Sequence, residues 1–174
     1  MLVTGLGPVG LAALMLAKAM GANLRIGVEG NPYRISLAKK LGLADYVFSP
    51  EEAFDRIMEV TGGKGVERSI DASASDSGRQ LAIRAAREWG KIAFVGEGGS
   101  CTFQPSPDII HGQKTIYGSW VTSLWRMEEL VERLVRWGIH PEDLITHEFP
   151  LDEAGQAYQL MASGSCGKVA VVFD

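Results

Sequence analysis

The sequence has little of what marks several classes of protein. Its two cysteines, Cys101 and Cys166, are far apart and lack metal-ligand spacing, so a reducing, cytoplasmic setting is the simplest account. The net charge of −4 does not indicate the positively charged surface that nucleic-acid binding requires. No apolar run is long enough to span a bilayer, and the N-terminus lacks the pattern of a signal peptide. We therefore expect a cytoplasmic protein with neither nucleic acid nor a membrane as partner.

The sequence also lacks a recognisable catalytic or metal-binding cluster. No histidine has an i,i+4 partner, and the three lie in different segments: His111, His140 and His147. The serines near residue 75 have no histidine partner and no nucleophile-elbow pattern, so acyl transfer is not expected. We predict that this chain itself holds no catalytic residue and no metal ligand.

A glycine-rich turn near the N-terminus is the feature that organises the chain. Residues 5–10 read Gly-Leu-Gly-Pro-Val-Gly, which fits G-x-G-x-x-G between a short apolar strand and a helix. Gly5 would allow the sharp turn, Gly7 would leave room for a ligand phosphate, and Gly10 would let the helix pack close to the strand. The positive end of the helix dipole would favour a bound pyrophosphate. A plain turn between two packed elements is the simpler alternative.

An acidic residue after the second predicted strand favours the dinucleotide interpretation. Glu29 lies 19 positions after Gly10, near the spacing of about 20 expected for the acid that binds the adenosine ribose. Its carboxylate could accept hydrogen bonds from both ribose hydroxyls and would repel a 2′-phosphate. We therefore expect NAD as the cofactor, with NADP less favoured.

Apolar periodicity predicts an alternation of strands and helices over the whole chain. The expected strands are residues 1–4, 24–28, 46–48, 66–72, 91–96, 114–120 and 169–173, with an extended piece at 146–150. The helix after the fourth strand is expected to carry Trp89 and to end at Gly90. This alternation predicts an α/β fold with a doubly wound parallel sheet of six strands, flanking helices, and a ligand at the carboxyl ends of the strands.

Local signals predict where several helices begin and which side chains they bury. Asn31 is the expected N-cap of the second helix. Ser49 and Glu52 have capping-box form, and Phe54 in the helix that follows is expected to face the core. Asp152 is expected to cap the last helix.

With these residues placed, the chain resembles the cofactor-binding half of the medium-chain, zinc-type alcohol dehydrogenases. The matching pieces run through nearly the whole sequence: residues 5–11, 27–29, 38–42, 61–65, 90–92 and the tail from 149 to 169. The resemblance implies one NAD(P)-binding Rossmann domain over residues 1–174, from an oxidoreductase that transfers hydride between an alcohol or polyol carbon and nicotinamide. In that family, zinc is held by a separate N-terminal catalytic domain. We expect that domain to be missing here, residues 140–174 to be a tail that packs on it, and this segment to be inactive alone.

The resemblance also implies roles for individual residues. Pro8 and Val9 would lie at the pyrophosphate, and Asn31 could reach the ribose as well as cap its helix. Arg34 would lie near the adenosine ribose, where it leaves some room for NADP, or would only be a solvated helix residue. The strand ends at Ala72, Ser73, Val95 and Gly96 would border adenosine and nicotinamide. The remaining candidates are Ser119 and Val121 at the carboxamide and Lys168 at the pyrophosphate or simply exposed.

Three other functions and one assembly remain open from the sequence. The chain could be a non-catalytic NAD(H)-sensing module, a zinc-free quinone reductase domain of the same superfamily, or a methyltransferase. Gly10 and the dehydrogenase-like tail count against the methyltransferase. Because the family pairs its sixth strand across a two-fold axis, the resemblance implies a homodimer through the edge strand Lys114 to Trp120.

Overall fold

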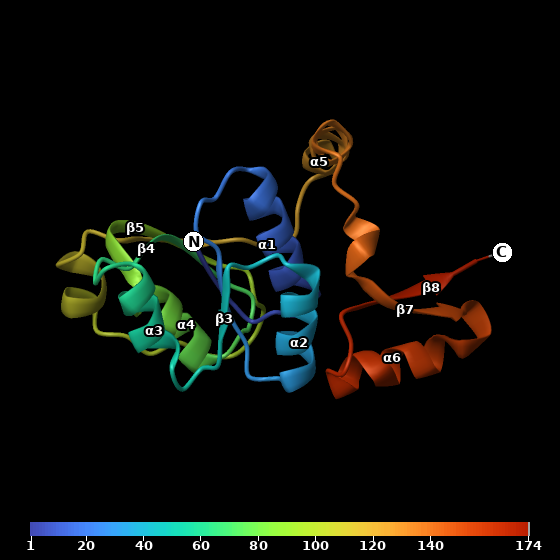
Figure 1. Cartoon of the computed structure of the whole chain (residues 1–174), viewed down its shortest axis with the longest axis horizontal. Helices are drawn as coiled ribbons and strands as arrows, with labels where there is room; N and C mark the ends of the chain where they lie inside the picture. Colours follow the sequence, from blue (N-terminus) through green and yellow to red (C-terminus); the bar gives the residue numbers. More distant parts are fainter. Residues whose placement is uncertain (174) are drawn as a thin grey trace.

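The computed structural model describes residues 1–173. Its main body is a six-stranded parallel sheet in the order β3-β2-β1-β4-β5-β6, with helices on both faces (Figure 1), which confirms the predicted doubly wound fold. The strands are β1 (Leu2–Thr4), β2 (Ile26–Val28), β3 (Tyr46–Phe48), β4 (Val66–Asp71), β5 (Ala86–Phe94), β6 (Thr115–Gly118), β7 (Ile145–Pro150) and β8 (Lys168–Val172). The α-helices are α1 (Pro8–Ala19), α2 (Pro32–Leu41), α3 (Ala53–Val60), α4 (Asp76–Arg84), α5 (Leu124–Trp137) and α6 (Ala154–Ser163).

The central strand β1 divides the core into two layers. Leu2 and Val3 are both fully buried, but successive side chains of a strand point to opposite faces. Leu2 packs in a cluster with Ile57 of α3, whereas Val3 packs in a second cluster with Leu14 of α1. The strand is therefore buried along its whole length because α1 and α2 cover one face and α3 and α4 the other.

The turn between β1 and α1 depends on close backbone contact. Gly5 has φ +83°, a left-handed conformation that glycine adopts without strain. A Cβ on Gly10 would lie only 1.8 Å from the Gly5 carbonyl oxygen and 3.3 Å from Val3 Cγ1. The predicted role of Gly10 in close helix–strand packing is thus confirmed.

The C-terminal residues form a small unit beside the main sheet. Strands β7 and β8 pair in parallel, and α6 packs on them, at the right of Figure 1. The unit is joined to the main body by Leu144, which is buried in the cluster formed by α1 and α2. That residues 140–174 also pack on a further domain stays a prediction.

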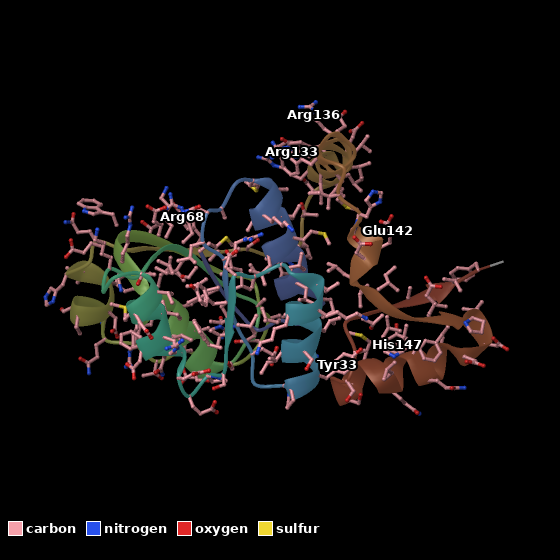
Figure 2. The ribbon with its side chains drawn as sticks, in the orientation of Figure 1. Tyr33, Arg68, Arg133, Arg136, Glu142 and His147 are labelled. Atoms are coloured by element: carbon pink, nitrogen blue, oxygen red, sulfur yellow. The ribbon has the colours of Figure 1, made fainter. Side chains whose placement is uncertain are left out.

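Helix α5 forms where the apolar periodicity predicts it, yet none of its residues is buried. It lies at the outer edge of the molecule, where Figure 2 labels Arg133 and Arg136. Its apolar side chains Met127, Leu130 and Val131 are all exposed, so the structure leaves this face uncovered. Within residues 1–173, no helix combines the length and the apolar character needed to cross a membrane.

The helix after β4 is shorter than predicted. It ends at Arg84, and the chain joins the sheet at Ala86, which pairs with Val66. Residues 87–90 bulge out of β5, and Trp89 is exposed with φ +61° instead of lying on a helix. The Ala85 carbonyl accepts a hydrogen bond from the Val66 amide at 2.8 Å, and a Cβ on Gly65 would lie 2.5 Å from the same oxygen, so the chain pairs with β4 directly after the helix.

Four further local predictions need correction. Helix α3 starts at Ala53 and buries Ala53 and Ile57, so Phe54, next to Ala53, faces solvent. The capping box is only half formed, since the Ser49 amide donates to Glu52 Oε1 at 3.5 Å while Ser49 does not cap the helix. Asp152 lies in a 3-10 turn before α6 and makes no cap hydrogen bond. The edge strand β6 is also shorter than the predicted residues 114–120.

Gly10 and Gly155, which both lie inside helices, allow a matched test of the β1–α1 contact. Replacing Gly10 by alanine should destabilise the fold by about 1–3 kcal/mol or more, because the new methyl group collides with the Gly5 carbonyl. Gly155 in α6 has nothing within 4 Å of its would-be Cβ, so Gly155→Ala should be neutral or stabilise by about 0.5–1 kcal/mol. Urea unfolding measures both, and equal effects of the two variants would contradict the packing argument.

Candidate dinucleotide-binding site

A cavity of about 330 Å³ opens at the carboxyl ends of the central strands. It lies between the ends of β1, β2 and β4 and the start of α4. This is the point where the strand order reverses, and ligands bind there in open α/β sheets. Its walls include six of the residues predicted from the sequence: Gly5, Gly7, Glu29, Arg34, Ala72 and Ser73.

Glu29 holds the glycine turn in place as well as facing the cavity. Its Oε2 accepts a hydrogen bond from the Leu6 amide at 2.8 Å. Its Oε1 accepts from the amides of Gly30 at 2.8 Å and Asn31 at 3.0 Å. A carboxylate has about four acceptor positions, so three are occupied and one remains on Oε2 for a ligand hydroxyl. The carboxylate is therefore oriented before any ligand binds.

Arg34 lies beside Glu29 at the mouth of the cavity. Its Nη1 is 4.0 Å from Glu29 Oε2, and its side chain is one quarter exposed. The buried Nε of Arg34 has no hydrogen-bond partner. A Cβ on Gly7 would lie 3.7 Å from Nη1, so the guanidinium reaches across to the glycine turn. The site thus offers one carboxylate acceptor and one cationic donor at the same edge.

Asn31 caps α2 as predicted. Its Oδ1 accepts from the amides of Tyr33 at 2.9 Å and Arg34 at 3.4 Å. Its Nδ2 donates to the Gly164 carbonyl at 3.2 Å, and Gly164 ends α6. Both ends of the amide are occupied, so this side chain ties the edge of the site to the C-terminal unit.

The start of α1 presents backbone donors toward the glycine turn. Pro8 is the first helical residue and has no N–H, while Leu11 N already donates to the Gly7 carbonyl at 2.9 Å. The amides of Val9 and Gly10 belong to the first turn, where no intrahelical acceptor exists. An anion at this helix start would meet these donors and the positive dipole end.

The other predicted residues lie outside the walls of this cavity. The amides of Val95 and Gly96 donate to the Asp71 carbonyl, which holds the end of β5 against β4. Ser119 N donates to the Phe94 carbonyl, and Val121 is largely exposed just beyond β6. Lys168 begins β8 in the separate two-stranded sheet. Their contacts with a cofactor stay predictions.

Sequence reasoning missed several residues that line the cavity or support it. The missed lining residues are Thr4, Val28, Gly30, Pro50, Ser75, Ser77, Gly78 and Leu81. The missed supporting contact is the ion pair between Arg79 of α4 and Asp71, which is fully buried. The signal for the serines was their position directly after β4, where a parallel sheet places its ligand.

The histidines and cysteines form no shared site. His111 ends a π-helical turn, His140 precedes a short 3-10 helix, and His147 lies in β7 (Figure 2). Among residues 1–173, no group of three or more His, Cys, Asp and Glu side chains could hold a metal ion. Burial raises the pKa of the Cys101 thiol, so it stays protonated at neutral pH and is a poor nucleophile. These residues therefore do not fit a zinc site.

Comparison with known proteins identifies the family. The family model described as zinc-binding dehydrogenase matches residues 8–136. The chain belongs to the zinc-binding dehydrogenase family. It is 46% identical over 174 residues to the uncharacterized zinc-type alcohol dehydrogenase-like protein YphC of Escherichia coli, covering 99% of this chain and 49% of that protein. It is 35% identical to the L-threonine 3-dehydrogenase of Pyrococcus horikoshii, covering 97% of this chain and 49% of the relative.

Solved structures of alcohol dehydrogenases share the fold. A short chain alcohol dehydrogenase from Escherichia coli, complexed with cofactor NADH, superimposes with a TM-score of 0.85 at 24% identity. The match covers 99% of this chain and 51% of that one. The chain spans about half the length of the curated relatives it matches.

The contacts of Asn31 can be separated by two substitutions. Serine keeps the cap but is too short to reach Gly164, so Asn31→Ser should cost only about 0.5–1.5 kcal/mol, the loss of one hydrogen bond. Asn31→Ala loses both contacts and should cost about 1 kcal/mol more, the value of an N-cap. Urea unfolding of the three proteins measures the difference, and equal stability of the serine and alanine variants would contradict the capping role.

Proposed function

We propose that the chain binds NAD(H) in the cavity at the ends of β1, β2 and β4. The main support for this proposal is the Glu29 carboxylate, which three backbone amides hold in place beside the glycine turn. The first amides of α1, which have no acceptor within the helix, lie at the same turn. The guanidinium of Arg34 supports it, because this residue lines the cavity beside Glu29 and supplies a cationic donor for a polar ligand group. The NADH complex of a structurally similar dehydrogenase adds support.

In this proposal different residues bind different parts of the cofactor. Glu29 and Arg34 bind the adenosine ribose, while the turn from Gly5 to Gly10 and the first amides of α1 hold the pyrophosphate. The ends of β4 and β5 border the adenosine and nicotinamide groups. The nicotinamide supplies the hydride chemistry when bound, and the chain's own residues bind and orient it.

The oxidoreductase function follows from the family and rests on this binding. We propose that the protein transfers hydride between an alcohol carbon and nicotinamide as part of a zinc-type alcohol or polyol dehydrogenase. The zinc is held by residues other than those described here, since these residues offer no ligand cluster. This segment alone then binds cofactor but does not turn over an alcohol.

The charge of Glu29 predicts preference for NADH over NADPH. The one acceptor position left on Oε2 suits a ribose hydroxyl, whereas a 2′-phosphate would meet the carboxylate charge. Glu29→Ala should weaken NADH binding by about 1–3 kcal/mol and should narrow the ratio of NADH to NADPH affinity. Calorimetric titration of both cofactors measures the ratio.

The ratio separates two roles of Glu29. Loss of the Leu6, Gly30 and Asn31 contacts would disturb the turn and weaken both cofactors alike, whereas loss of ribose recognition changes their ratio. Glu59→Ala, an exposed acid on α3, is the matched control and should leave both affinities unchanged. Equal or stronger NADPH binding by the unaltered chain would remove the ribose assignment.

We also propose a homodimer through the free edge of β6. Within residues 1–173 this strand pairs only with β5, and Tyr117, Trp120 and Val121 are exposed there. An unpaired edge with apolar side chains favours pairing with a second copy. Ile116 is unsuitable for a test because it packs against the core under β5.

A charge on the edge strand tests the dimer. Tyr117→Lys should shift the chain from dimer to monomer, because a charge on the edge strand opposes its pairing with a second copy. Tyr158→Lys on α6 changes a tyrosine that is still more exposed and lies away from the edge, and it should leave the dimer intact. Sedimentation equilibrium decides the question, and a monomeric unaltered chain at high concentration would count against the proposal.

A further inference from the structure

Two loops at the carboxyl edge of the sheet lie in direct contact. The loop after β4 covers residues 72–75, and the loop after β5 covers residues 95–100. A Cβ on Gly96 would lie 2.5 Å from the Ala74 amide nitrogen, and one on Gly99 would lie 2.0 Å from the Ala74 carbonyl oxygen. The second loop can therefore lie against the first only as long as both positions remain glycine.

Arg79 of α4 holds the loop after β5 by two hydrogen bonds. Its Nη2 donates to the Gly96 carbonyl at 2.7 Å, and its Nη1 donates to the Ser100 carbonyl at 3.3 Å. The side chain is only one tenth exposed, and its guanidinium lies 5.5 Å from the centre of the Phe94 ring. One rigid fork thus fixes both ends of the segment 96–100.

The charge of Arg79 is matched by a buried carboxylate. Its Nε lies 3.4 Å from Asp71 Oδ2, close enough for an ion pair but outside hydrogen-bond geometry. Asp71 Oδ1 in turn accepts from Thr4 Oγ1 at 2.9 Å and from Ser73 Oγ at 2.6 Å. The ion pair therefore connects the ends of β1, β4 and β5.

Charge neutralisation alone does not account for this arrangement. A buried carboxylate needs one cationic partner, yet two of the three guanidinium nitrogens of Arg79 point at loop carbonyls instead. A lysine in its place would carry the same charge but could not reach both carbonyls and the carboxylate. The hydrogen bonds of Arg79 therefore hold the loop 96–100 in position.

We propose that Arg79 is a positioning residue that fixes the loop 96–100 for the nicotinamide half of the bound dinucleotide. The inference rests on the proposed NAD(H) function and assigns Arg79 no contact with the cofactor. The adenosine half is held by Glu29 and the glycine turn, on the other side of β1. Loss of Arg79 should therefore weaken ligands that carry the nicotinamide group more than ligands that lack it.

Two ligands separate the two halves of the site. NADH contains both halves, whereas ADP-ribose contains the adenosine and pyrophosphate without nicotinamide. In calorimetric titrations of the full chain, Arg79→Met should weaken NADH by about tenfold or more, the factor of a lost charge-assisted hydrogen bond. Its affinity for ADP-ribose should fall by a much smaller factor, because Glu29 and the glycine turn are untouched and only the Asp71 contacts to Thr4 and Ser73 are affected. Arg79→Lys should give an intermediate loss for NADH.

A glycine pair tests the same loop without touching the ion pair. Gly98 and Gly99 both have positive φ, at +84° and +64°, so alanine is strained at either position. Only Gly99→Ala also drives a methyl group into the Ala74 carbonyl, since nothing lies within 4 Å of a Cβ at Gly98. Gly99→Ala should weaken NADH selectively, and Gly98→Ala should do so much less.

Cys101 reports the loop position independently of binding. It follows Ser100 and is partly exposed, whereas Cys166 is fully buried and serves as an internal reference. Arg79→Met should speed labelling of Cys101 by a thiol reagent without exposing Cys166. If Arg79→Met unfolds the chain, Cys166 will label too, and the Gly98 and Gly99 variants then decide the question.

The results distinguish failure of the positioning role of Arg79 from failure of the proposed NAD(H) function. If the unaltered chain binds neither ligand, the NAD(H) function itself fails and the inference with it. If the unaltered chain binds both but Arg79→Met weakens them equally, or weakens neither, the positioning role is wrong. Selective loss of NADH, together with faster Cys101 labelling, supports it.

Discussion

The contact between the Gly5 carbonyl and α1 at Gly10 is the constraint on which this domain depends. It brings the start of a helix against the end of the central strand, with no side chain between them. The first amides of α1 are thereby directed at the point where the sheet reverses its strand order. A larger distance between Gly10 and the Gly5 carbonyl would leave α1 packed on the sheet but would move its amide donors away from the cavity.

Around this contact, polar side chains bond mainly to backbone. Glu29 accepts from three amides, Asn31 accepts from two, and Asp71 accepts from amides as well as hydroxyls. Such bonds fix the loops at the carboxyl edge of the sheet before a ligand arrives, so binding need not order them. The binding face is built from loops, but these loops are as constrained as the strands they extend.

The sequence was sufficient for the features that depend on local pattern. The spacing of Gly5, Gly7, Gly10 and Glu29 predicted the strand–turn–helix unit and the position of the acid, because both follow from one βαβ unit. It could not predict that Glu29 also holds the Leu6 amide. Arg79 was missed because its partners, Asp71 and Gly96, are brought to it only by the parallel pairing of β4 with β5. Trp89 looked helical by periodicity, and only the contact between Gly65 and Ala85 shows why the helix stops earlier.

The bond from Asn31 to Gly164 has a consequence for communication between the two units of the chain. Arg34 lies beside the same glycine, with Nη2 3.6 Å from a Cβ at Gly164, and also lines the cavity. One end of α2 therefore belongs to both the ligand site and the attachment of the C-terminal unit. A ligand that draws Arg34 toward the cavity would change the free energy with which β7, α6 and β8 dock on α2. By thermodynamic reciprocity, the docking of these elements would change the binding free energy of the ligand by the same amount. The ligand site and the C-terminal unit thus share contacts at the start of α2, through Asn31 and Arg34.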